Sequence, residues 1–164
     1  MATVKNESVL SQLPEKEARF LIDESVKIAR RVDSNSLEGV LGEVWKTLDK
    51  KDYGWEEAIL DGRWYRYPSE IRNQVFCSEQ ALKNYLLLGT LGVPALYIVA
   101  ERWARNMAHE TIAVPHNGKL LGLDWEEVFP VKIEGGKLID EESGKVMSSK
   151  VYVIETNEVL RRVR

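Results

Sequence analysis

The chain has 164 residues, a formal net charge of -3, 44% hydrophobic and 30% charged residues, which is typical of a globular protein. The acidic balance gives no electrostatic reason to expect nucleic-acid binding. One cysteine excludes an internal disulfide and a multi-cysteine zinc site. No apolar run approaches the roughly 18 residues that a membrane span needs. We therefore expect one domain over residues 1–164, with no nucleic-acid or membrane partner, in the cytoplasm, where a thiol stays reduced.

The first third of the chain indicates helices without reactive groups. Residues 1–13 are expected to form a mobile lead, and Pro14 to start an amphipathic helix that ends near Val32. Its apolar face is expected to comprise Ala18, Leu21, Ile22, Val26, Ile28 and Ala29. Residues 33–36 indicate a turn and helix cap, and apolar spacing from Leu37 to Leu48 predicts a second helix.

Residues 50–67 carry five aromatic side chains, namely Tyr53, Trp55, Trp64, Tyr65 and Tyr67. Some of them could form a wall of a binding cleft, because binding sites combine aromatic groups with a few polar ones. They could instead pack the first two helices against the next helix. Packing is the favoured interpretation, since large aromatic residues are usually core material. Residues 68–70 then indicate a short helical turn.

The only cysteine, Cys77, stands at the start of a third predicted helix. Apolar residues recur at spacings of three and four from Ser78 to Leu91, and Gly92 with Pro94 supplies a helix stop. Cys77 therefore falls at or just before the first turn. Backbone N–H groups and the positive end of the helix dipole favour thiolate over thiol at that position.

A β-hairpin follows, because residues 109–114 and 119–124 read as strands around Pro-His-Asn-Gly. If Val114 opposes Lys119, then His109 opposes Asp124. If Asn-Gly alone forms the loop, Asp124 lies diagonal to His109. Both registers put His109 and Asp124 on one face, since they differ by two residues.

The remainder of the chain predicts more sheet and a final helix. Residues 128–133, 137–139 and 145–154 read as strands that extend an antiparallel sheet from the hairpin. Thr156 can cap a last short helix. We expect the arginines near its end to be solvated. The chain thus predicts an α+β fold with helices first and the nucleophile's helix packed on an antiparallel sheet.

Cys77, His109 and Asp124 are the residue types that thiol acyl transfer needs. A thiolate attacks, an imidazole takes and returns the proton, and a carboxylate holds the imidazole in one tautomer. The backbone N–H of Cys77 could add one oxyanion donor, and Gln74, three residues ahead of the thiol, could add another. The alternative for Gln74 is an exposed loop position.

Each site residue also has a structural interpretation. A lone cysteine is usually buried and inert, and Asp124 could simply bind a nearby backbone N–H. His116 is a rival base, but its position in the turn predicts an exposed loop tip. Glu110 should point away from His109 by strand alternation. One cysteine and two histidines without close spacing make a metal site a poor explanation, and no residue indicates a cofactor.

Four segments together resemble the transglutaminase-like superfamily, of the small prokaryotic or archaeal type. They read F-C-S-E-Q-A-L, L-G-V-P-A, H-E-T-I-A-V and L-L-G-L-D-W, and they lie between about Tyr65 and Trp125. The resemblance implies a papain-like core with Cys77 as nucleophile, His109 as general base and acid, and Asp124 as its orienter. The chain departs from the family at Val75, where Gly is frequent, and at Thr111 or Ile112, where an aromatic is frequent.

We therefore expect an enzyme that cleaves peptide or protein amides through a thioester, as a cysteine protease or amidase does. Water resolves the thioester in a hydrolase, whereas an amine does so in a transglutaminase. Hydrolysis is favoured because the chain is small and shows no sign of extra domains. A non-catalytic peptide-binding module on the same fold is the alternative from another class. The substrate and oligomeric state stay open.

Overall fold

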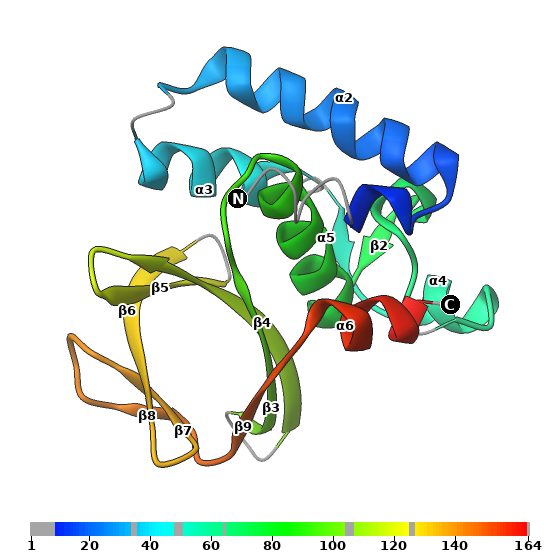
Figure 1. The fold of residues 1–164 in the computed structure, drawn as a ribbon. Coiled ribbons are helices and arrows are strands. Elements are labelled where there is room, and N and C mark those ends of the chain that lie inside the picture. Colours follow the sequence, from blue (N-terminus) through cyan, green and yellow to red (C-terminus); the bar gives the residue numbers. More distant parts are fainter. Residues whose placement is uncertain are drawn as a thin grey trace.

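A computed structural model describes residues 9–33, 36–47, 51–63, 65–103, 107–124 and 127–163. It confirms the α+β class, with helices packed on an antiparallel seven-stranded sheet (Figure 1). The helices are α2 (Glu15–Arg31), α3 (Leu37–Lys46), α4 (Glu56–Leu60), α5 (Cys77–Thr90) and α6 (Thr156–Val163), with a 3-10 turn, η1 (Pro68–Glu70). The strands are β1 (Asp52–Tyr53), β2 (Gln74–Val75), β3 (Leu96–Trp103), β4 (Met107–His116), β5 (Lys119–Asp124), β6 (Glu127–Glu134), β7 (Lys137–Asp140), β8 (Val146–Ser148) and β9 (Val151–Ile154).

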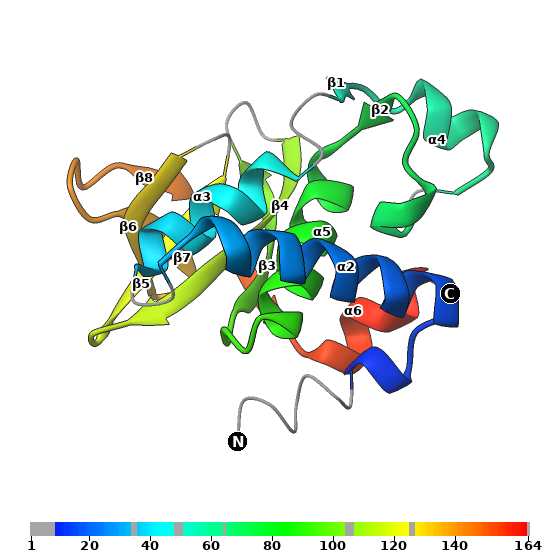
Figure 2. The same ribbon diagram turned by 90° about the horizontal axis from the view of Figure 1, so that it is seen from above.

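Helix α5 lies between the sheet and the helices α2 and α3. It contacts β3 and β4 on one side and α2 and α3 on the other, and the view from above shows α2 crossing in front of it (Figure 2). Its buried residues include charged Glu79 and Lys83 as well as the leucines. The Nζ of Lys83 donates to the carbonyl oxygens of Val44 and Trp45, at 2.7 and 3.1 Å. Lys83 thus satisfies carbonyls at the C-terminus of α3.

The segment before α2 is packed where the structure describes it. Residues 9–11 are helical, Val9 and Leu10 pack against the core, and Leu13 is buried. This part of the expected mobile lead, residues 9–13, is therefore fixed by apolar contacts. Residues 1–8 of that lead lie outside the described residues.

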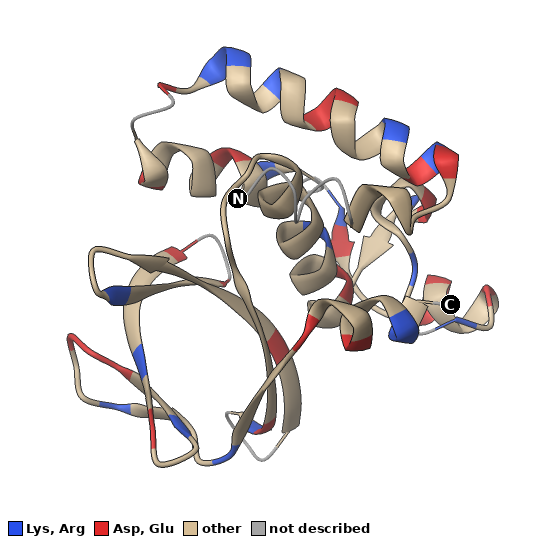
Figure 3. Cartoon of the chain, in the orientation of Figure 1, with Lys and Arg blue, Asp and Glu red and all other residues tan. Residues whose placement is uncertain are grey.

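The apolar face expected for α2 is partly wrong. Leu21 and Ile28 are buried as expected, but Ile22 and Val26 are exposed. The buried face instead runs through Glu17, Leu21, Ser25 and Ile28. Glu17 can face inward because its carboxylate accepts hydrogen bonds from the backbone N–H and the hydroxyl of Ser69. Charges of both signs alternate along the helix (Figure 3).

Helix α3 follows the predicted cap and spacing. The Oγ of Ser36 accepts a hydrogen bond from the backbone N–H of Gly39 at 3.1 Å. Val40, Leu41 and Val44 are buried. Leu48, expected at the end of this helix, lies outside the described residues.

The large sheet has the strand order β8-β7-β6-β5-β4-β3-β9. The strand expected over residues 145–154 is two strands, and β9 pairs with β3 at the opposite edge from β8. The sheet therefore curls back on itself (Figure 1). One apolar core lies between the helices and the sheet, and a smaller one, with Ile98, Ala113 and Leu138, lies among the strands.

The hairpin adopts the second of the two possible registers. Ile112 pairs with Leu123 and His116 with Lys119, so Asn117 and Gly118 alone form the loop. Their φ angles of 50° and 74° are the left-handed values that a type I′ turn requires. Within the described residues, no helix is both long and apolar enough to cross a membrane.

Core truncation on α5 tests this layered packing. Leu87 is 0% exposed and Leu60 on α4 is 86% exposed. We expect Leu87→Ala to lower the free energy of unfolding by about 2–5 kcal/mol, because it leaves a cavity in the core. Leu60→Ala should change it by less than about 0.5 kcal/mol. Urea unfolding followed by circular dichroism measures both, and equal losses would contradict the assignment of α5 to the core.

Candidate active site

Cys77 is the first residue of α5 and is half-buried. Phe76 before it is extended, with φ -124° and ψ 176°, so the chain turns sharply from β2 into the helix. Glu79 accepts a hydrogen bond from the backbone N–H of Phe76 across this first turn. The expected position of the thiol at a helix N-terminus is therefore confirmed.

His109 and Asp124 are brought together, as both hairpin registers predicted. The Nε2 of His109 lies 2.9 Å from the Oδ2 of Asp124, and both residues are less than 10% exposed. Burial lowers the pKa of His109, but hydrogen bonds and charge from Asp124 and Cys77 outweigh it and raise the pKa to about 9. The imidazole is thus protonated at neutral pH. It is hydrogen bonded to the carboxylate and to the thiol.

Trp103 packs on the imidazole of His109, a contact that the sequence did not predict. Its ring centroid is 4.5 Å from that of His109, with the planes inclined at 36°. The β3–β4 register shifts between Ala100 and Trp103, and Trp103 then pairs with Met107. Such irregularities redirect side chains, here onto the histidine. The indole covers one face of the imidazole and limits its contact with water.

Tyr53 is a further site residue that the sequence interpretation placed in the core. Strand β1 pairs in parallel with β2, so Tyr53 lies beside Val75, two residues before Cys77. Burial raises the pKa of the Tyr53 hydroxyl, and the charge of Cys77 and a hydrogen bond to it raise it further. A parallel pair of two-residue strands leaves no period in the sequence, so nothing there signals this contact.

The aromatic-rich segment therefore divides into two groups. Tyr67 is buried in the core and Tyr65 packs partly against it, as the packing interpretation predicted. Tyr53 and Trp55 are instead 51% and 48% exposed, with their rings edge-to-face at 6.3 Å. The packing interpretation is wrong for these two. Trp64 lies outside the described residues.

A buried guanidinium, that of Arg66, anchors the start of α5. Its Nε and NH2 donate to Glu79 at 2.7 and 2.9 Å, and its NH1 donates to Glu57 at 2.7 Å. Its NH2 also donates to the carbonyl oxygen of Gln74 at 2.9 Å. Hydrogen bonds to Glu79 and Glu57 raise the pKa of Arg66 although burial lowers it. One cation thus joins α4, β2 and the first turn of α5.

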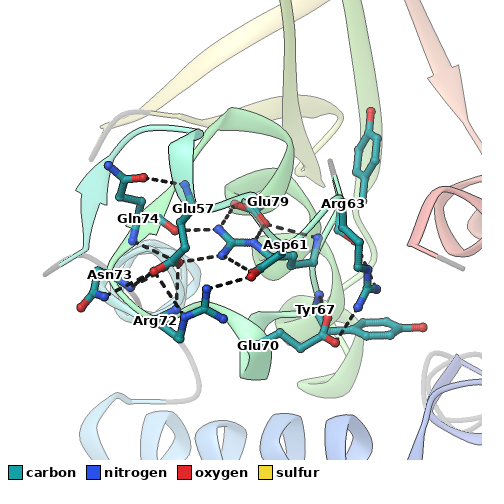
Figure 4. A network of polar contacts seen from close by, with 11 residues as sticks. Glu57, Asp61, Arg63, Tyr67, Glu70, Arg72, Asn73, Gln74 and Glu79 are labelled. Carbon is teal, nitrogen blue, oxygen red and sulfur yellow. Dashed lines mark hydrogen bonds and ion pairs between the residues drawn. The ribbon is translucent and has the colours of Figure 1, made fainter. Parts of the chain in front are cut away.

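Glu57 completes this network from the side of α4. Its carboxylate accepts backbone N–H groups of Arg72, Asn73 and Gln74 (Figure 4). Burial raises the pKa of Glu57, but the hydrogen bonds from Arg66 and these backbone groups outweigh it and lower the pKa to about 2. The turn that leads into Cys77 is therefore fixed by hydrogen bonds to its backbone.

Gln74 also belongs to this turn, and its side-chain oxygen accepts from the backbone N–H of Glu57 at 3.0 Å. It is half-buried, so the exposed-loop alternative does not hold. An oxyanion role for its amide nitrogen stays a prediction.

Glu110 and His116 lie apart from the His109–Asp124 pair. Glu110 is bonded to the hydroxyls of Tyr65 and Tyr97 and to Arg162, which agrees with its alternation away from His109. Arg162 is thus paired rather than solvated as expected. His116 is exposed, and its Nε2 lies 3.2 Å from the side-chain nitrogen of its neighbour Asn117.

Neither a metal site nor the hollow beside α2 adds a second candidate among the described residues. No group of three or more His, Cys, Asp and Glu side chains could hold a metal ion in the part of the chain that the structure describes. An open hollow of about 510 Å³ lies along α2 and η1, lined by Glu15, Lys16, Arg19, Phe20, Asp23 and Ser69. Its lining contains none of Cys77, His109 and Asp124.

Comparison with known proteins gives only distant likeness. No family model and no curated protein matches the sequence. Among solved structures, Legionella pneumophila LapG is similar at 14% identity and a TM-score of 0.48, over 87% of this chain and 89% of that chain. Its calcium-bound form is similar at 14% identity and a TM-score of 0.49, over 99% of both chains. Likeness at this level carries no inference about activity.

Acid unfolding tests the Glu57 network. A carboxyl whose pKa is lowered on folding stabilises the protein above its ordinary pKa of 4.5, and the stabilisation is lost as pH falls towards 2. We expect Glu57→Gln to reduce the free energy of unfolding at pH 7 by on the order of 2 kcal/mol and to flatten its decline between these pH values. Exposed Glu142→Gln is the matched control. If the free energy of unfolding of Glu57→Gln falls with pH as steeply as that of Glu142→Gln, the network is contradicted.

The rate of thiol alkylation tests whether His109 activates Cys77. Because the chain has one cysteine, only Cys77 can give the signal. Free cysteine titrates near about 8.5, so an unassisted thiol reacts slowly at pH 6. We expect rapid alkylation of the folded protein at pH 6, a marked loss in His109→Ala, and no change in His116→Ala. If the alkylation rate follows the pH dependence of free cysteine, or if Cys77 reacts only after the protein unfolds, Cys77 is a packing residue.

Proposed function

We propose that this chain is a thiol-dependent enzyme that hydrolyses amide bonds of peptides or proteins. Cys77 is the nucleophile, His109 the general acid and base, and Asp124 the residue that orients the imidazole. One observation carries the proposal: the 2.9 Å contact between His109 Nε2 and Asp124 Oδ2 on a histidine that is also hydrogen bonded to Cys77. The motifs that resemble the transglutaminase-like superfamily support the same three residues.

The first half of the reaction acylates the thiol. The Cys77 sulfur attacks the amide carbonyl carbon, and the carbonyl oxygen becomes an oxyanion that the backbone N–H of Cys77 can stabilise. His109, protonated at neutral pH, gives its proton to the leaving nitrogen. The C–N bond breaks, an amine leaves, and a thioester and a neutral imidazole remain.

The second half restores the enzyme. Neutral His109 takes a proton from water as the water oxygen attacks the thioester carbon. The C–S bond breaks, the acyl group leaves as a carboxylic acid that releases its remaining proton to solvent, and the thiolate and imidazolium re-form. Asp124 binds Nε2 throughout, so the other ring nitrogen, Nδ1, is the one that exchanges the proton.

Water is the acceptor that we propose, although the same three residues serve either acceptor. Transfer to an amine requires a site that binds the amine and excludes water, whereas hydrolysis requires neither. A glutamine-donor peptide offered with and without a primary amine separates the two reactions. Preferential incorporation of the amine would overturn hydrolysis in favour of a transglutaminase.

Cleavage of a peptide library derived from a denatured protein mixture, with products identified by mass spectrometry, tests the proposed function. We expect Cys77→Ala to abolish cleavage and Asp124→Asn to lower kcat by about 10³–10⁴-fold, because the amide no longer holds the reactive tautomer. His109→Ala should lower kcat at least as much as Asp124→Asn does, whereas His116→Ala should retain full activity. Activity that survives Cys77→Ala would refute the assignment of the nucleophile.

A further inference from the structure

Several large apolar side chains near Cys77 and His109 are exposed to solvent. On one side are Tyr53, Trp55 and Ile59, which are 51%, 48% and 54% exposed. On the other are half-buried Trp103 and Met107, which is 65% exposed. We call these five residues the flanking surface. Exposed apolar groups that gather in one place mark interaction sites more often than those scattered singly.

The flanking surface adjoins both members of the thiol–imidazole pair. Tyr53 is hydrogen bonded to Cys77, and the ring of Trp103 lies on that of His109. Trp55 stacks edge-to-face with Tyr53, and Met107 pairs with Trp103 across the strands. A chain that places an amide at the Cys77 sulfur therefore reaches apolar side chains of this surface on either side.

The exposure of this surface is built into the fold, because the backbone beneath it is fixed. The N–H groups of Asp52 and Gly54 donate to carbonyl oxygens of Asn73 and Val75 at 2.9 and 3.1 Å. Gly54 and Ala58, which alternate with the exposed residues, are buried. Trp55 and Ile59 are one helical turn apart, so they share a face of α4. Side chains on a rigid support lose little additional entropy when they bind.

From this arrangement we infer that the substrate is a protein segment with a bulky aliphatic or aromatic side chain next to the scissile amide. The flanking surface binds that side chain, with Trp55 as its main specificity determinant. The inference rests on the proposed function, since it concerns the substrate of the same three residues. It goes further by assigning a recognition role to residues that take no part in the chemistry.

Cleavage-site mapping followed by kinetics on two synthetic peptides tests the inference. The peptides share the sequence of a mapped site and differ only in one bulky apolar residue, replaced by Ser in the second. We expect Trp55→Ala to lower kcat/KM for the apolar peptide by about tenfold and to leave the Ser peptide unchanged, since one apolar contact discriminates by this order. Iodoacetamide alkylation of Cys77 should keep its rate, which shows that the reactive pair is intact.

Tyr152→Ala is the matched control, because Tyr152 is an aromatic residue on β9 that is 43% exposed. It should affect neither peptide. Cleavage without preference for apolar residues, or equal effects of Trp55→Ala and Tyr152→Ala, would overturn the inference while leaving the proposed function standing. Absence of any Cys77-dependent cleavage would overturn both. A change in solution mass in Trp55→Ala, with unchanged kinetics, would assign the surface to contact between copies of this chain and overturn the inference.

Discussion

The buried guanidinium of Arg66 is the interaction on which the site depends. It joins three segments, namely α4, β2 and the first turn of α5. A buried ion pair gains little net stability, because desolvation offsets the attraction. Removing one partner is nevertheless costly, since an unpaired buried charge remains. The network therefore acts mainly as a constraint on geometry: it fixes where the backbone stops being a strand and becomes the helix that carries Cys77.

The second constraint is the register of the strands, which places the partners of the thiol. The two-residue turn at Asn117 and Gly118 sets the diagonal relation of His109 and Asp124, and the irregularity after Ala100 turns Trp103 onto the histidine. The helix and the hairpin meet because α5 packs on β4. A shift of one residue in the hairpin would move either His109 or Asp124 to the opposite face. Core packing and site geometry are therefore set by the same pairing.

Much of this arrangement is readable from the sequence, because it rests on local signals. Helix spacing and a Gly-Pro stop define α5, Asn-Gly defines the hairpin, and a period of two puts His109 and Asp124 on one face. What the sequence could not predict depends on contacts between distant segments. The burial of Glu17 on α2 depends on hydrogen bonds from Ser69, which is distant in sequence, and the short parallel pair of β1 and β2 has no periodic pattern. No local pattern marks Arg66, and Tyr53 fits the favoured packing interpretation until those segments meet.

Burial and charge oppose one another at His109, and the outcome explains the form of the site. Burial alone would favour the neutral ring, so a histidine under Trp103 without a partner would lose its proton. Asp124 and Cys77 reverse that effect, and they do so more strongly because few water molecules compete in a site of low dielectric. The same burial that disfavours a lone imidazolium thus strengthens the pair that holds it. Cys77 is half-buried beside the flanking surface. A substrate that covers this surface would exclude more water from the thiol. An apolar substrate segment would therefore do more than bind: by completing the enclosure, it would strengthen the charge interactions on which the proposed reaction depends.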